Sequence, residues 1–140
     1  MHAIRIGMTA LAVLLVAGTG PAPTQAMESH DFAGEYLMEG WNLNTPGPGY
    51  RGVCSVEGGG PAYRVSCTNS DTGHKYVGKG LALGKTFSVL IGSELAVACP
   101  ELPSDEYLVV YERQSNGVLE GTWINAHDAT AGVETLVRAP

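Results

Sequence analysis

Apolar and polar residues alternate with a period of two along most of this chain, which points to strands throughout. Runs such as EYLMEGW, YRVSC and EYLVVYE are short and rich in Tyr, Val and Leu. Clusters of turn-forming residues, among them NTPGPG, TNSDTGH and RQSNG, separate the runs at spacings of roughly ten residues. We therefore predict an all-β fold, an antiparallel up-and-down barrel of the lipocalin or calycin type with about eight strands. A β-sandwich is the alternative, and the short connections favour the barrel.

The first 26 residues have the pattern of a secretory signal peptide. His2 and Arg5 precede an apolar run from Met8 to Ala17, and small residues then lead to Ala26. The apolar run is well short of the roughly 20 residues that a membrane-spanning helix needs. We therefore expect export to the periplasm or the medium, with residues 1–26 removed as a signal peptide and residues 27–140 forming a single barrel domain.

The charge balance argues against nucleic acid as a partner. Loss of residues 1–26 removes one of the eight Lys and Arg residues and none of the fourteen Asp and Glu residues, so the net charge changes from −6 to −7. A chain this acidic is repelled by phosphate backbones. No later stretch is long and apolar enough to predict a transmembrane segment in the mature chain.

The segment CSVEGGGPAYRVSC, residues 54–67, predicts a β-hairpin closed by a disulfide bond. With residues 59–62 as a four-residue loop, Cys54 lies opposite Cys67 and both side chains point to the apolar face. Opposed residues of two antiparallel strands are close enough for a disulfide bond, which persists in an oxidising compartment.

A third cysteine leaves the pairing open. We predict ELAVAC as a strand that turns Leu95, Val97 and Cys99 toward the core. Cys99 could then displace either partner of the hairpin bond, or no bond could form. Whichever cysteine stays unpaired would act as a small apolar side chain.

Several stretches that resemble catalytic motifs are interpreted as turns. Asp71-Thr72-Gly73 matches the aspartic-protease triplet, but it follows polar residues where that enzyme class has a buried apolar strand. The glycines at 58–60 lie between two strands, so the helix of a phosphate-binding loop is missing.

The histidines predict neither a nucleophilic nor a metal site. His30, His74 and His127 fall in expected loops or at strand ends, with nothing to bring them to Cys99. No C-x-x-C, H-x-H or H-x-x-x-H spacing occurs for a metal ion. We therefore predict no catalytic residue, no metal and no cofactor.

Glycines recur beside aromatic or branched residues, as in barrels whose strands coil and bend. The recurring motifs are Gly34-Glu35-Tyr36, Tyr50-Arg51-Gly52, Tyr63-Arg64-Val65, Tyr76-Val77-Gly78-Lys79-Gly80, Leu119-Glu120-Gly121-Thr122-Trp123 and Gly132-Val133-Glu134-Thr135-Leu136. In them the chain resembles a group of small exported proteins of alpha-proteobacteria, some labelled fibronectin-binding. The resemblance covers nearly all of residues 27–140, apart from the cysteines and the longer CPELPSDEY connection.

The resemblance implies a shared fold, with no active site to carry over. It gives a structural role to eight residues: Gly34, Tyr36, Gly52, Tyr63, Tyr76, Gly78, Gly121 and Trp123.

Three functions remain open for such a barrel. The leading expectation is an exported, non-catalytic binding module for a protein partner, such as a host or matrix protein. The alternatives are a lipocalin-like carrier of a small apolar ligand and a secreted enzyme inhibitor. We expect a packed interior without a reactive group, because small barrels are just filled by side chains or hold one small ligand. The aromatic residues expected to fill it are Tyr36, Tyr63, Tyr76, Tyr107, Tyr111 and Trp123.

Overall fold

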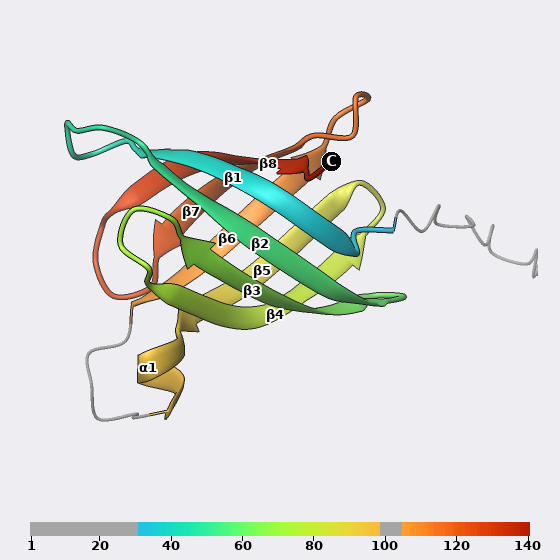
Figure 1. The fold of residues 1–140 in the computed structure, drawn as a ribbon, viewed down its shortest axis with the longest axis horizontal. Coiled ribbons are helices and arrows are strands. Elements are labelled where there is room, and N and C mark those ends of the chain that lie inside the picture. The colour runs from blue at the N-terminus through green and yellow to red at the C-terminus, as the bar shows by residue number, and fades with distance from the viewer. Residues whose placement is uncertain (1–30, 99–104) are drawn as a thin grey trace, which may run out of the picture.

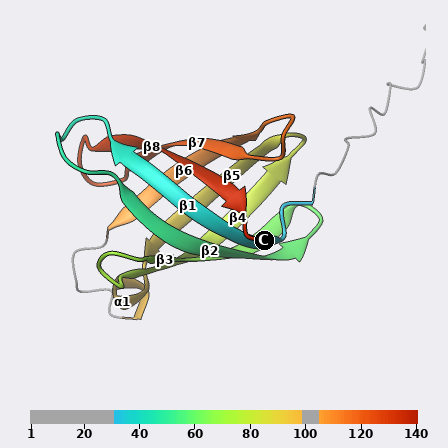
Figure 2. The same ribbon diagram turned by 45° about the horizontal axis from the view of Figure 1, so that its top comes forward.

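The computed structural model describes residues 31–98 and 105–140, and these form a closed antiparallel β-barrel (Figure 1). Each strand pairs with the next, and the last pairs with the first, so the sheet has no free edge. Figure 2 shows β1 between β2 and β8. The strands are β1 (Gly34–Asn42), β2 (Tyr50–Gly59), β3 (Ala62–Asn69), β4 (Lys75–Leu83), β5 (Thr86–Ser93), β6 (Glu106–Arg113), β7 (Leu119–Asn125) and β8 (Ala131–Arg138).

The predicted all-β barrel is confirmed, and period-two alternation builds its two faces. In β7, for example, every second residue is buried, from Leu119 to Asn125. The residues between them face outward, because successive side chains of a strand point to opposite sides. The proposed signal peptide, residues 1–26, lies outside the described residues. No helix in the described ranges is long and apolar enough to cross a membrane.

The β2–β3 hairpin has the predicted register. Cys54 is paired with Cys67 and Val56 with Val65, and the two cysteines form a disulfide bond with Cα atoms 4.1 Å apart. The loop is shorter than predicted, because Gly59 and Ala62 still pair and only residues 60 and 61 make the turn. A shorter loop centred on the same point leaves the register unchanged.

The prediction of a strand at ELAVAC is wrong. Residues Glu94–Ala98 form a short helix, α1, in the connection after β5, and the side chain of Leu95 is 66% exposed. Glu, Leu and Ala are good helix formers, and a short apolar run does not distinguish a strand from a helix. Cys99 lies outside the described residues.

One end of the barrel is closed by the segment that precedes β1. Phe32 is fully buried, and its ring stacks on Phe87 with centroids 4.9 Å apart. The hydroxyl of Tyr36 donates to the carbonyl of Phe32 at 2.8 Å. Arg113 and Arg138 donate to the carbonyl of residue 31 at 2.9 and 3.1 Å. The segment therefore acts as a plug at the end where β8 finishes.

Candidate functional site

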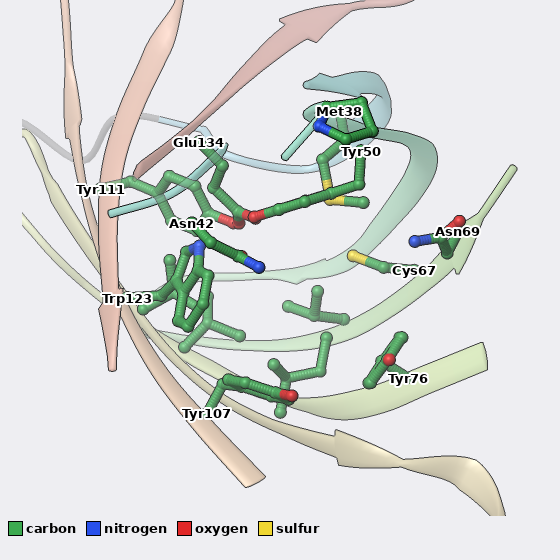
Figure 3. Close-up of a pocket in the computed structure, with 15 residues that line it drawn as sticks. Met38, Asn42, Tyr50, Cys67, Asn69, Tyr76, Tyr107, Tyr111, Trp123 and Glu134 are labelled. Carbon is green, nitrogen blue, oxygen red and sulfur yellow. The ribbon is translucent and has the colours of Figure 1, made fainter. Parts of the chain in front are cut away.

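The barrel interior contains a cavity of about 330 Å³ (Figure 3). It extends to the end opposite the plug, where the 43–49, 70–74 and 126–130 loops join the strands. The walls are mainly aromatic and aliphatic, with a few polar groups. The lining residues are Met38, Asn42, Pro48, Tyr50, Val65, Cys67, Asn69, Tyr76, Val89, Ile91, Tyr107, Val109, Tyr111, Trp123 and Glu134.

The expectation of a packed interior is therefore wrong, and glycines facing inward provide the physical reason. Three cavity-lining aromatic residues each pair directly with a glycine on the neighbouring strand: Tyr50 with Gly40, Tyr111 with Gly121, and Trp123 with Gly132. In each pair the ring covers the place that the Cβ atom of any larger residue would occupy at the glycine position. The rings therefore lie along the wall and leave the centre open.

Glu134 is the buried carboxyl group of this cavity. Its side chain projects inward from β8 with only 7% of its surface exposed. The hydroxyl of Tyr50 donates to Oε2 at 2.7 Å, and the hydroxyl of Tyr111 donates to Oε1. Burial raises the pKa of Glu134, although both hydrogen bonds act in the opposite direction by stabilising the charged form.

The two tyrosines are held in their neutral, donating form. Burial and the neighbouring Glu134 carboxyl raise the pKa of both Tyr50 and Tyr111 well above the ordinary tyrosine value. No Lys, Arg or His is among the cavity-lining residues of the described chain. Glu134 is thus compensated by hydrogen bonds alone, without an opposite charge in the cavity wall.

Trp123 presents an unsatisfied donor in the same wall. Its indole Nε1 is buried and has no hydrogen-bond partner in the part of the chain that the structure describes. The Tyr50 hydroxyl lies close enough for the indole to lower its pKa, but the two make no hydrogen bond of normal geometry. Buried donors are normally paired, so this N–H group is available to donate to any acceptor atom that enters the cavity.

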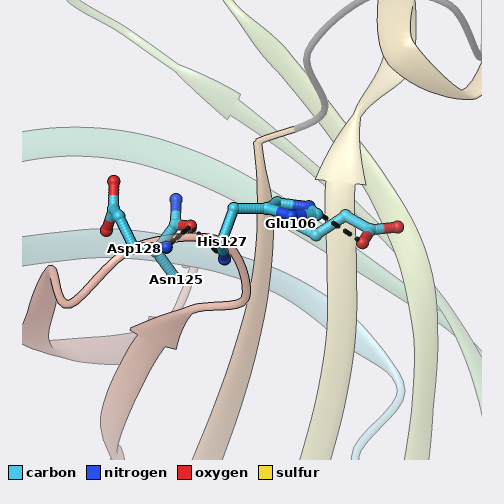
Figure 4. Close-up of polar contacts among 4 residues, drawn as sticks. All are labelled: Glu106, Asn125, His127 and Asp128. Carbon is cyan, nitrogen blue, oxygen red and sulfur yellow. Dashed lines mark hydrogen bonds and ion pairs between the residues drawn. The ribbon is translucent and has the colours of Figure 1, made fainter.

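The loop between β7 and β8, at the open end of the barrel, is held by polar contacts (Figure 4). Asn125 Oδ1 accepts hydrogen bonds from the backbone N–H groups of His127 and Asp128 at 2.7 and 3.2 Å. His127 Nε2 lies 3.3 Å from Glu106 Oε2 at the start of β6, which ties the loop to a neighbouring strand.

The eight residues with a predicted structural role lie in different parts of the barrel. Tyr36 and Tyr63 are buried near the plug, whereas Tyr76 and Trp123 line the cavity. The four glycines allow close approach. Those at positions 34 and 121 adjoin Arg138 and the Tyr111 ring, and those at 52 and 78 adjoin the backbones of Thr68 and of Leu90.

The other sequence motifs that the structure describes lie in turns and exposed loops. Asp71-Thr72-Gly73 is a turn, in which Asn69 Oδ1 accepts hydrogen bonds from the backbone N–H groups of Asp71 and Thr72. His74 and His127 are exposed in loops, and His30 lies outside the described residues. Within residues 31–98 and 105–140, no three His, Cys, Asp or Glu side chains gather as metal ligands.

Sequence reasoning missed Glu134 as a functional residue. The signal was present, since Gly132, Glu134 and Leu136 share the inward face of one strand. A carboxyl group in an inward position is unusual, because acidic residues are rarely buried without a partner.

Comparisons with known proteins establish the fold only. No protein-family model and no curated protein matches the chain. Among solved structures, one redesigned beta barrel is similar with a TM-score of 0.63 and 17% identity, over 77% of this chain and 91% of that chain. A second redesigned beta barrel, mFAP1 bound to DFHBI, is similar with a TM-score of 0.60 and 16% identity, over 76% of this chain and 94% of that chain.

Proposed function

We propose that this chain is an exported, non-catalytic barrel that binds a small, largely apolar molecule in its cavity. The observation that carries the proposal is the open cavity, whose apolar walls hold a buried carboxyl group and an unpaired indole N–H. Binding sites for small molecules are typically apolar pockets of about 300–1,000 Å³ with a few fixed polar groups. Export is supported by the signal-like residues 1–26 and by the Cys54–Cys67 bond.

The barrel architecture agrees with this proposal. Barrels of about eight strands are wide enough to hold one small ligand when side chains leave the centre open. A redesigned barrel of similar fold is described as bound to DFHBI, so a barrel of this kind can hold a small molecule.

Neighbouring valines of β6 allow a matched test. Val109 points into the cavity and Val110 points outward, with 4% and 43% of their surfaces exposed. We expect Val109→Phe to weaken binding of the apolar dye N-phenyl-1-naphthylamine about tenfold or more by filling the cavity. Val110→Phe, the same change on the outer face, should bind like the wild type. Dye fluorescence titrations measure the affinity, and equal binding by all three proteins would contradict the proposal.

A protein partner is the second candidate, favoured by an apolar stripe on the outer face. Leu90, Leu108 and Ile124 pair side by side across β5, β6 and β7, and about half of each side chain is exposed. Contiguous exposed apolar residues of this kind often mark protein-binding surfaces. Fibronectin is the probe suggested by the resemblance to labelled exported proteins.

The same variants separate the two candidates. If the stripe binds a protein, Leu108→Glu should abolish binding to immobilised fibronectin while Val109→Phe retains it. The dye should show the reverse order, because Leu108 lies outside the cavity. Absence of fibronectin binding by the wild type would remove this partner.

A further inference from the structure

We propose that the cavity selects a small organic cation, namely an aromatic ammonium compound of about two rings whose N–H groups donate to Glu134. This inference rests on the small-ligand function proposed above and names the chemical class of the ligand. It follows from four features of the site: the carboxyl group that has no opposite charge beside it, the aromatic walls, the charges near the mouth and the size of the cavity.

The first feature is the carboxyl group. Glu134 receives hydrogen bonds from two tyrosine hydroxyls, but these neutral donors contribute no positive charge. Each carboxyl oxygen can accept a second hydrogen bond. A buried carboxylate is stabilised most strongly by a cation that also donates hydrogen bonds, and none lines the described wall. An ammonium group of the ligand would supply both the charge and the donors.

The second feature is the aromatic wall. Tyr76, Tyr107 and Trp123 line the side of the cavity facing Glu134, and Tyr107 meets the rings of Trp123 and Tyr76 edge-on at 5.4 and 6.1 Å (Figure 3). Faces of Tyr and Trp rings attract organic cations, because their quadrupoles are negative above the ring plane. The same rings would pack against the apolar body of the ligand.

The third feature is the distribution of charge along the barrel. Asp105 and Asp128 lie near the mouth, close enough to contribute to raising the pKa of Tyr107. Arg113 and Arg138, in contrast, hold the plug at the opposite end. Lys75 and Arg51 also lie near the start of strands at the open end, and His127 there is next to Glu106. The carboxylates near the mouth favour the approach of cations over anions.

The fourth feature is size. An apolar cavity of about 150 Å³ is sufficient to bind benzene. The volume of about 330 Å³ here is therefore suited to a molecule of two fused rings with a short side chain.

Isothermal titration calorimetry with two matched probes tests the inference on the protein with its disulfide intact. The cation 1-naphthylmethylamine and the neutral alcohol 1-naphthylmethanol have nearly the same shape. Near neutral pH, we expect the wild type to bind the amine about tenfold or more tightly than the alcohol. Glu134→Gln should reduce this preference to less than about threefold, because the amide is similar in shape without the charge. Glu120→Gln, on the outward face of β7, should keep it.

A pH series on the wild type makes the test independent of whether Glu134→Gln folds. The preference for the amine should shrink as the pH is lowered and Glu134 becomes protonated. The groups facing it are Tyr50 and Tyr111, which stay neutral, whereas Asp105 and Asp128 near the mouth contribute only at longer range. The adjoining strands β1 and β7 present Met38, Gly40, Gly121 and Trp123, none of which titrates.

Each outcome is decisive. Equal or tighter binding of the alcohol, or tighter binding of the anion 1-naphthoate, would overturn the cation preference while leaving a ligand-binding cavity. Failure of every probe and of the apolar dye to bind would overturn the proposed function itself.

Discussion

At the scale of single residues, Glu134 is the group on which the chemistry of the cavity depends. Burial disfavours its ionised form, and the two tyrosine hydroxyls favour it, with burial the larger effect. Tyr50 lies on β2 and Tyr111 on β6, each two strands away from β8 in the barrel. Their raised pKa values keep both hydroxyls as donors at neutral pH. The carboxyl group is therefore oriented before any ligand arrives, which lowers the entropic cost of binding.

The raised pKa of Glu134 predicts a specific dependence of stability on pH. Between the unfolded value near 4.5 and the higher folded value, the native protein binds more protons than the unfolded chain. This contribution is fully present at low pH, and it is lost as the pH rises through the folded pKa. Urea unfolding over this range should therefore show a steeper loss of stability in the wild type than in Glu134→Gln.

The outward-facing Glu120→Gln variant is the control for this measurement and should follow the wild type. Parallel curves for the wild type and Glu134→Gln would show that burial leaves the Glu134 proton affinity unchanged.

At the scale of elements, pairs of glycine and aromatic residues on adjacent strands form the cavity wall. In each pair the glycine allows its strand to bend, because it has no side chain. The aromatic ring on the neighbouring strand then covers the glycine backbone. Tyr111 on β6 covers Gly121 on β7 and also donates to Glu134 on β8. The packing of β6 on β7 therefore also determines where the Tyr111 hydroxyl meets Glu134 on β8.

Substituting this glycine should damage both stability and the site. A Cβ atom at position 121 would lie 2.5 and 2.6 Å from two atoms of the Tyr111 ring, so the ring would have to move. We expect Gly121→Ala to lower the free energy of unfolding by about 1–3 kcal/mol, the usual cost of overpacking. It should also weaken ligand binding, because displacement of the ring disturbs its hydrogen bond to Glu134.

Gly59→Ala provides a matched control at the end of β2, where an added Cβ atom meets nothing within 4 Å. Its free energy of unfolding should stay within about 0.5 kcal/mol of the wild type. Chemical denaturation measures both variants, and equal stability of the two would refute the close contact at Gly121.

At the scale of the whole molecule, the barrel has one plugged end and one open end. The plug buries Phe32 against Phe87 and Tyr63, and two arginines bind the backbone beside it. The open end presents the cavity and the loop tied by His127 and Glu106. The buried aromatic plug and the opening of the cavity therefore lie at opposite ends of the barrel.

This separation predicts different effects from two aromatic truncations. Phe32→Ala should lower the free energy of unfolding by about 3–5 kcal/mol, the usual cost of deleting a large buried aromatic side chain. Binding of the naphthyl probes to the folded fraction should be unchanged, because Phe32 does not line the cavity.

Trp123→Ala should also lower the free energy of unfolding, because the indole is only 7% exposed. Unlike Phe32→Ala, it should in addition weaken probe binding by the folded protein, since the indole forms part of the cavity wall. Thermal unfolding and calorimetry distinguish the two variants, and loss of probe affinity in folded Phe32→Ala would contradict the division of roles.

Local pattern predicted the strands, favoured a barrel over a sandwich, and gave the register that places Cys54 opposite Cys67, although it left the cysteine pairing open. Strand faces follow from period-two alternation, and the hairpin register follows from two cysteines placed symmetrically about one turn. The same local logic failed at Glu94–Ala98, where five residues satisfied the alternation but form a helix. Over so short a run, helix propensity and alternation make competing predictions that sequence alone does not resolve.

Only the tertiary structure decided whether the interior is filled or hollow. The sequence predicted which residues point inward, but the orientation of each aromatic ring depends on the residue opposite it on the neighbouring strand. Glu134 meets Tyr50, 84 positions away, because the barrel closes through the pairing of β1 with β8. Alternation is a property of one strand, whereas a cavity and its buried carboxyl group are properties of all the strands that surround them.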